Sequence, residues 1–232
     1  MPKQARVKIG ASTACASYWL APRIANFADA FPQVELHLFA TDHEKQLAQD
    51  DLDLAIRYGK PDWPNVTSLF LFGEEIFPVC SPAYLEEHPG LRTIEDLMSA
   101  TLLHWEGAPS HWIHWPQWFG AKGMTFPGPV RGSIFNNYSL LMQAAVNGQG
   151  LSLAWRYIVD DLLEKGQLVR PIDTSLQSDA GYYLITPVQP ELPAEVSSCA
   201  SWIVKEALCS SRKALPSAAA AVCTTTISAV PN

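Results

Sequence analysis

The chain has 232 residues, of which 48% are hydrophobic and 17% charged, a composition that is ordinary for a folded globular protein with a sizeable core. Its formal net charge is −7, and lysine and arginine form no cluster, which argues against direct binding to a nucleic-acid backbone because that requires several cations on one face. No segment reaches the roughly 18 apolar residues of a membrane span, and the opening residues have no apolar run like that of a secretory signal peptide.

The cysteines predict reduced thiols rather than a disulfide framework. They are odd in number and widely spaced, at Cys15, Cys80, Cys199, Cys209 and Cys223, which is typical of a cytoplasmic protein. His111 and His114 are close enough on a helix to share a metal ion, but no third ligand accompanies them. We therefore expect neither a metal nor a cofactor.

The first third of the chain alternates strand-like and helix-like segments. Alternating polar and apolar residues predict strands over residues 6–12, 34–40 and 52–58. A helix is expected over residues 18–32, where it ends at Pro32 and carries an apolar stripe of Leu20, Ile24, Phe27 and Phe31. A shorter helix is expected over residues 45–51. This order predicts parallel strands with helices on both faces of a sheet.

The rest of the chain continues the alternation and shows clear helix starts. Ser81 followed by Pro82 has the pattern of an N-cap and a first helical residue, and Thr93 and Asp96 have capping-box spacing. A helix is also expected from about Asn137. Further strands are predicted over residues 76–80, 100–105, 151–155, 168–172 and 180–187, and a final helix over 194–208.

Three tryptophans recur every third residue in the middle of the chain, at Trp112, Trp115 and Trp118. The simpler interpretation is one helix face packed into a core. The alternative is an aromatic wall for a cationic ligand, since cation–π contact suits quaternary ammonium groups.

The strands and helices fall into two clusters, and the second, roughly residues 81–180, is inserted between strands of the first. Two lobes joined by two crossing strands would place a ligand in the cleft between them, and closing that cleft would be a hinge motion.

Seven segments resemble, in order, the effector-binding half of a LysR-type transcriptional regulator, in the branch that includes the glycine-cleavage and β-lactamase regulators. They are "WLAPRIANFADAFPQVEL", "DLDLAIRYGKPDWPNV", "FPVCSPAYL", "TLLHW", "LMQAAVNGQGLSLA", "LEKGQLVRP" and "YYLI". No single segment is specific, but together they cover about Val7 to Leu208, so the resemblance is strong.

The resemblance implies an α/β fold with two Rossmann-like lobes joined by two crossing strands, like a type II periplasmic binding protein. Lobe I would comprise residues 5–80 and 183–209, an inserted lobe II residues 81–182, and a C-terminal tail residues 210–232. It also implies a small-molecule effector in the cleft, a homodimer or homotetramer, and contact with DNA only through an N-terminal helix-turn-helix domain that this sequence does not contain.

The end of the first strand offers several candidate ligand-binding groups. Ser12 and Thr13 would present hydroxyls and free amides at a helix start, a favourable place for an anion, with simple capping as the alternative. The resemblance aligns Ala14 with a position that is commonly Ser or Thr and contacts the ligand in relatives. It aligns Cys15, also a candidate reactive thiol, with a position where Phe is frequent.

The ends of the next two strands offer candidates of both charges. Among Thr41, Asp42 and Gln46, the Asp42 carboxylate could receive an ammonium group or simply cap a turn. Arg57 could hold an effector anion or pair with an acid, whereas Tyr58 is expected to be architectural.

Lobe II and the late crossing strand complete the predicted site. Asn136 and Asn137 precede a helix that faces the cleft in this fold, and Trp155 offers an aromatic face at a strand end. Tyr183 matches a cleft position in relatives, with core packing as the alternative. The full candidate set is Ser12, Thr13, Ala14, Cys15, Thr41, Asp42, Gln46, Arg57, Asn136, Asn137, Trp155 and Tyr183.

These groups favour an anionic or zwitterionic effector, and the tryptophans leave room for a quaternary amine. The sequence has no GxSxG serine, P-loop or dinucleotide-binding glycine pattern, so we expect a ligand-binding protein and not an enzyme. A periplasmic solute-binding protein of a transporter is the alternative. The ordered family segments, the free cysteines and the opening residues favour a cytoplasmic regulator that does not bind membranes.

Overall fold

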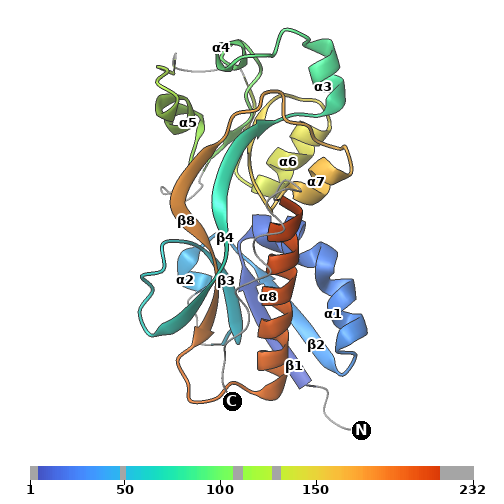
Figure 1. Cartoon of the computed structure of the whole chain (residues 1–232), viewed down its shortest axis with the longest axis vertical. Coiled ribbons are helices and arrows are strands. Elements are labelled where there is room, and N and C mark those ends of the chain that lie inside the picture. Colours follow the sequence, from blue (N-terminus) through green and yellow to red (C-terminus); the bar gives the residue numbers. More distant parts are fainter. Residues whose placement is uncertain (1–4, 48–50, 107–111, 127–131, 215–232) are drawn as a thin grey trace.

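The computed structural model describes residues 5–47, 51–106, 112–126 and 132–214. A six-stranded sheet in the order β2-β1-β3-β8-β4-β7 runs through the molecule, and β5 and β6 form a separate pair (Figure 1). The strands are β1 (Ala5–Ala11), β2 (Val34–Ala40), β3 (Leu54–Gly59), β4 (Val66–Val79), β5 (His104–Trp105), β6 (Ile134–Phe135), β7 (Ser152–Trp155) and β8 (Leu176–Pro187).

Helices cover the sheet at both ends of the molecule. They are η1 (Cys15–Leu20), η2 (Ala21–Arg23), α1 (Ile24–Ala30), α2 (Glu44–Leu47), α3 (Pro82–Glu87), α4 (Ile94–Leu97), α5 (Trp115–Ala121), α6 (Tyr138–Val146), α7 (Asp160–Glu164) and α8 (Ala194–Ala214). In Figure 1, β1 to β3 with α1, α2 and α8 lie in the lower part, here called lobe I, and α3 to α7 lie in the upper part, here called lobe II. The long strands β4 and β8 run between the two.

The parallel arrangement predicted for the first strands is confirmed, but it ends at β3. Strand β1 pairs in parallel with β2 and β3. Strands β8, β4 and β7 then add in antiparallel order. The prediction found only residues 76–80 of β4 and 180–187 of β8, because neither crossing strand is apolar along its whole length.

The crossing strands approach each other closely at Gly181. A Cβ atom at this position would lie 2.9 Å from the carbonyl oxygen of Phe72 on β4. Just beyond it the pairing shifts, since Gly73 faces Gly181 whereas Glu74 faces Ser178. Two residues of β8 are therefore left without a partner on β4, a β-bulge that turns the local side chains.

The helix predicted over residues 18–32 is a composite. It starts with the wide turns of η1, tightens in η2 and becomes regular only in α1. Pro22 lies in η2 and has no amide hydrogen to continue the regular hydrogen-bond pattern, which accounts for the change of geometry there.

Two other predicted elements differ from the structure. Residues 168–172 form no strand beyond an isolated bridge of Val169 with Cys80, because Pro171 cannot donate to a neighbouring strand. The tryptophan repeat is not one helix face: α5 begins at Trp115, so Trp112 lies before it, and His111 lies outside the described residues.

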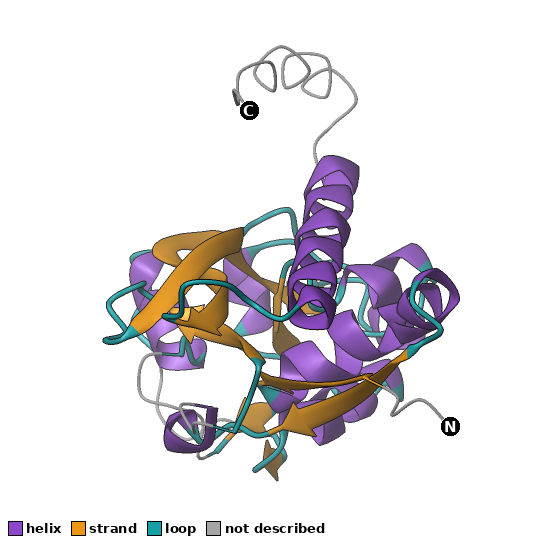
Figure 2. Ribbon diagram, turned by 90° about the horizontal axis from the view of Figure 1, so that it is seen from below, coloured by secondary structure: helices purple, strands orange, loops and turns teal. Residues whose placement is uncertain are grey.

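The last helix is longer than predicted and holds lobe I together. It continues to Ala214, so residues 210–214 belong to α8 and not to a tail. Ser210 is buried and accepts a hydrogen bond of 3.2 Å from the Trp19 indole. Helix α8 packs against β1, β4 and β8, and Figure 2 shows it from below, standing beside the strands.

The predicted helix starts in lobe II are confirmed in atomic detail. Thr93 and Asp96 form a capping box, and Asn137 caps α6. Ser81 caps α3 by accepting a hydrogen bond of 3.1 Å from the Tyr84 amide, and it is 4% exposed.

Replacing Ser81 by alanine removes this cap. We expect Ser81→Ala to lower the free energy of unfolding by about 1 kcal/mol, measured by urea denaturation, because the Tyr84 amide loses its acceptor. Ser197→Ala, at an exposed position of α8, is the matched control and should change stability by less than about 0.5 kcal/mol. Equal effects of the two substitutions would contradict the assignment.

Candidate functional site

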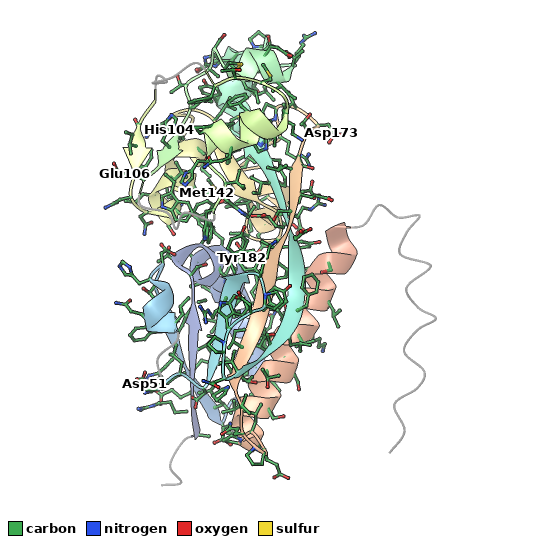
Figure 3. All side chains as sticks on the ribbon, turned by 90° about the vertical axis from the view of Figure 1, so that its left-hand side faces the viewer. Asp51, His104, Glu106, Met142, Asp173 and Tyr182 are labelled. Carbon is green, nitrogen blue, oxygen red and sulfur yellow. The ribbon has the colours of Figure 1, made fainter. Side chains whose placement is uncertain are left out.

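The ends of β3 and β8 present different side chains to the two faces of the sheet. Arg57 is paired with Tyr183, and Tyr58 with Tyr182. Since successive side chains of a strand point to opposite faces, the pairs separate. The rings of Tyr58 and Tyr182 lie 5.2 Å apart, and Figure 3 shows Tyr182 at the level where the two lobes meet, below Met142 of α6.

Arg57 and Tyr183 lie on the opposite face, around Trp63. The Arg57 guanidinium carbon is 4.6 Å from the Trp63 ring, and the Tyr183 ring is 5.7 Å from it. Arg57 also lines a cavity of about 380 Å³ with Leu52 and Ile185. Arg57 and Tyr183, both predicted for the effector site, thus point to the opposite face of the sheet from Tyr58 and Tyr182.

Lobe II adds four aromatic side chains to the tyrosine pair. Trp112 lies 4.7 Å from Tyr58, 4.9 Å from Trp105 and 5.0 Å from Trp155, measured between ring centroids. Tyr138, the first residue of α6, is 5.2 Å from Trp105. We call this cluster the aromatic junction; its members are Tyr58, Trp105, Trp112, Tyr138, Trp155 and Tyr182.

A buried carboxylate adjoins the aromatic junction. Glu74 of β4 is 5% exposed. Its Oε1 accepts hydrogen bonds from the Tyr58 hydroxyl and, at 2.7 Å, from the Trp155 indole, and its Oε2 accepts one from the Ser178 hydroxyl. Three donors aimed at one side chain fit an ionised carboxylate, which only accepts hydrogen bonds. Burial and then the Glu74 charge raise the pKa of Tyr58 far above its ordinary value, so this phenol stays a donor.

Two hydroxyls of the aromatic junction lack a hydrogen-bond partner of good geometry among the described residues. They are those of Tyr138 and Tyr182, and both are buried. Burial is the main cause that raises the pKa of both phenols, so they too remain protonated. A buried hydroxyl without a partner is unfavourable by about 1–3 kcal/mol, and a polar group of a ligand would relieve that.

The junction opens on one side into a cavity of about 650 Å³. Tyr58, Glu74 and Ser178 belong to its wall, together with Trp63 and Ile113. The unpaired bulge residues Asp179 and Ala180 also line it. This volume lies within the roughly 300–1,000 Å³ of small-molecule sites in proteins.

The helix start after β1 is already capped by an internal acid, so its predicted free amides are not free. Asp42 accepts hydrogen bonds from the Thr13 amide at 2.9 Å and the Thr13 hydroxyl at 2.5 Å. The Ser12 hydroxyl accepts from the Cys15 amide at 3.2 Å. Ala14 and Cys15 are buried. Asp42 thus takes the place that the sequence suggested for an effector anion, since an acid is favourable at a helix start.

The remaining predicted residues are spread around the junction. Thr41 donates a hydrogen bond of 2.6 Å to Gln46. Asn136 is exposed, whereas Asn137 uses its side chain to accept from the Ser139 and Leu140 amides. Of the twelve predicted residues, only Trp155 is a member of the aromatic junction. The ligand roles predicted for all of them stay predictions.

The set predicted from sequence does not include Glu74 or five members of the aromatic junction, Tyr58, Trp105, Trp112, Tyr138 and Tyr182. Alternation along "AIRYG" and "GYYLI" shows that one residue of each polar pair must face lobe II. Which one does so depends on the register of β3 with β8, and local sequence does not contain that register. For Glu74 the sequence offers only a weak indication of burial, namely an acidic residue next to an apolar segment.

Comparison with known proteins identifies the family. The model of the LysR substrate binding domain matches residues 2–208. The Glycine cleavage system transcriptional activator of Escherichia coli (strain K12) is 32% identical over 215 residues, which are 90% of this chain and 69% of that protein. The transcriptional activator AmpR of Rhodobacter capsulatus is 29% identical over 199 residues, covering 85% of this chain and 65% of its own length.

Solved structures agree with the sequence matches. The effector domain of the regulator AmpR of Pseudomonas aeruginosa superposes with a TM-score of 0.73 at 26% identity, over 91% of this chain and all of that domain. The chain belongs to the LysR family of transcriptional regulators and is the effector-binding domain of such a regulator. The two-lobed fold expected from the resemblance is confirmed.

Two further features of the described residues bear on function. No helix within them is long and apolar enough to cross a membrane. Nor do they contain a group of three or more histidine, cysteine or acidic side chains that could hold a metal ion.

Removing single hydroxyls distinguishes the bonded tyrosine from the unbonded one. We expect Tyr58→Phe to lower the free energy of unfolding by about 1–3 kcal/mol, because Glu74 loses a donor. Tyr182→Phe should leave it unchanged or raise it by up to about 1 kcal/mol, because a buried hydroxyl without a partner disappears. Urea denaturation of both variants measures the difference, and a larger loss in Tyr182→Phe would contradict the assignment.

The buried thiol of Cys15, at the start of η1, should be unreactive. Burial raises the pKa of Cys15 to about 12, and only a thiolate reacts. In the variant Cys209→Ser/Cys223→Ser, Ellman's reagent at pH 8 should modify no cysteine until the chain is unfolded. Because the folded pKa lies above the ordinary value of 9.0, stability due to this thiol is full below pH 9.0 and is lost as the pH rises toward about 12. Rapid native modification that Cys15→Ala abolishes would refute this.

Proposed function

We propose that the aromatic junction and its adjoining cavity bind the small-molecule effector of this LysR-type regulator. The observation that carries the proposal is the pair of buried, unsatisfied hydroxyls of Tyr138 and Tyr182. Tyr138 belongs to lobe II and Tyr182 to the crossing strand β8. Tyr58, whose ring lies 5.2 Å from that of Tyr182, lines a cavity of suitable size. Ligand sites often lie between lobes and combine apolar walls with a few polar groups.

Contacts between the lobes provide a way to transmit binding. Arg23 of lobe I makes two bonds of 3.2 Å to Asp161 of α7, and the Tyr18 hydroxyl donates a bond of 3.0 Å to the Ser139 carbonyl. We propose that the effector changes the angle at which these contacts hold the lobes. The effector can shift the equilibrium between two lobe angles only by the difference between its affinities for them.

LysR regulators as a family bind small-molecule effectors and act as oligomers on DNA. For this protein we propose a cytoplasmic homodimer or homotetramer, in which the lobe angle alters subunit pairing and thereby the spacing of the DNA-binding domains. A periplasmic solute-binding protein is not favoured, because the sequence relatives are named as transcriptional regulators.

The structure gives less support to an anionic effector than the sequence does. The anionic or zwitterionic class was inferred largely from helix amides that Asp42 and Ser12 already occupy and from Arg57, which lies around Trp63 on the other face. A zwitterion still suits the junction, provided that its cationic part is the one recognised there.

A thermal-shift screen tests the site. The panel contains amino acids, quaternary ammonium metabolites, aromatic acids and peptidoglycan fragments. We expect at least one compound to raise the melting temperature in a saturable way. Tyr182→Phe should weaken its binding by about tenfold, because one hydrogen bond is lost.

Small-angle scattering of the same complex then tests the lobe motion. A saturating compound should change the scattering profile of the unmodified chain. Identical profiles would count against a change of lobe angle, and a ligand that binds Tyr182→Phe as tightly as the unmodified chain would place the effector elsewhere.

A further inference from the structure

We infer that the effector carries an organic cation, an ammonium or quaternary amine, which binds in the adjoining cavity beside Glu74 and the rings of Tyr58 and Trp63. This inference rests on the proposed function of the aromatic junction as the effector site, and it adds the charge and chemical class of the ligand.

The first argument is the charge of Glu74 and its surroundings. Its carboxylate is buried, its three hydrogen-bond donors are all uncharged, and no lysine, arginine or histidine among the described residues forms an ion pair with it. Neutral donors offset part of the loss of hydration, but an isolated buried carboxylate still loses several kcal/mol unless a cation accompanies it. A cationic ligand would supply the missing charge.

Glu75, the residue next to Glu74, is a carboxylate that does have cationic partners. Glu75 follows Glu74 on β4 and lies on the opposite face of the strand. It is held by Arg156 at 3.0 Å and by Arg170 at 3.5 Å. One of two adjacent glutamates thus has two guanidinium partners, whereas the one at the cavity has hydrogen bonds only.

The second argument is the sign of the charge on the cavity wall. Besides Glu74, its lining includes Asp62 and Asp179, and its basic member is Lys60. The Lys60 ammonium lies 3.8 Å from Asp179, and both side chains are largely exposed. The wall is therefore acidic overall, which attracts a cation and disfavours a simple anion.

The third argument is the aromatic rings in the cavity wall. Tyr58 and Trp63 line the cavity together with Glu74. Aromatic faces attract cations, tryptophan most strongly, and they suit quaternary ammonium groups that cannot donate hydrogen bonds. A carboxylate that shares a cavity wall with two such residues is a combination that recognises an organic cation.

The test compares a cation with its uncharged isostere on the unmodified chain. Choline and 3,3-dimethylbutan-1-ol have nearly the same shape and differ in charge. Tetramethylammonium, glycine betaine and 1,5-diaminopentane extend the series to other cationic groups. Binding is followed by tryptophan fluorescence and isothermal titration calorimetry. We expect at least one cation to saturate, and choline to bind at least about tenfold more tightly than its isostere, as loss of the cation–π and charge terms implies.

Two substitutions on β4 then locate the charge. Glu74→Gln keeps the size of the side chain and removes its charge, so it should weaken cation binding by about tenfold or more. Glu75→Gln is the matched control, one position away on the opposite face, and should bind the cation as the unmodified chain does. Circular dichroism verifies that both variants are folded, and the isostere comparison decides the matter if Glu74→Gln is not.

Each outcome separates this inference from the proposed function. If no cation saturates up to about 10 mM, or if the isostere binds equally well, the inference is wrong. If neutral or anionic compounds then bind and lose affinity in Tyr182→Phe, the junction is still the effector site. If a cation binds through Glu74 while Tyr182→Phe and the scattering profile show no effect, Glu74 forms a cation site, but the proposed sensing role of the junction fails and the cation is not the effector.

Discussion

The hydrogen bonds that converge on the buried carboxylate of Glu74 determine how the centre of this molecule is built. Glu74 belongs to β4, and its donors belong to β3, β7 and β8. One side chain therefore connects four strands of the six-stranded sheet at the level where the lobes meet. A buried carboxylate requires such donors, and the bulge beyond Gly181 brings Ser178 to face it. The hydrogen bonds of Glu74 thus both tie the crossing strands to their neighbours and place a carboxylate at the junction.

The two lobes meet through contacts of two kinds. Aromatic rings from both lobes pack at the junction, and polar contacts such as Arg23 with Asp161 lie apart from it. A two-point contact between a guanidinium and a carboxylate has a defined geometry. The packing holds the lobes together, and the polar contacts favour the angle between them that the structure shows.

The helix start after β1 and the aromatic junction differ in how far their polar groups are satisfied within the protein. At the helix start after β1, Asp42 satisfies Thr13, and Ala14 and Cys15 bring no free polar group. At the aromatic junction, by contrast, the hydroxyls of Tyr138 and Tyr182 meet no hydrogen-bond partner of good geometry among the described residues, and the carboxylate of Glu74 meets no cationic side chain there. Relatives named as activators of glycine cleavage and of AmpR type have the same fold. The groups that a ligand would meet here are therefore a property of this chain's own residues.

The sequence by itself determined the elements whose causes are local. Side-chain periodicity defined β1, β2 and β3, and capping residues defined the starts of α3, α4 and α6. Ordered family segments defined the two-lobed fold. The tertiary structure alone decided which of Arg57 and Tyr58, and which of Tyr182 and Tyr183, faces lobe II, because a shift of one residue in the pairing of β3 with β8 would exchange them. It also decided that Asp42 caps a helix and that Glu74 is buried, because their partners are 29 positions away for Asp42 and 16, 81 and 104 positions away for Glu74. Interactions over such separations arise only when the chain has folded.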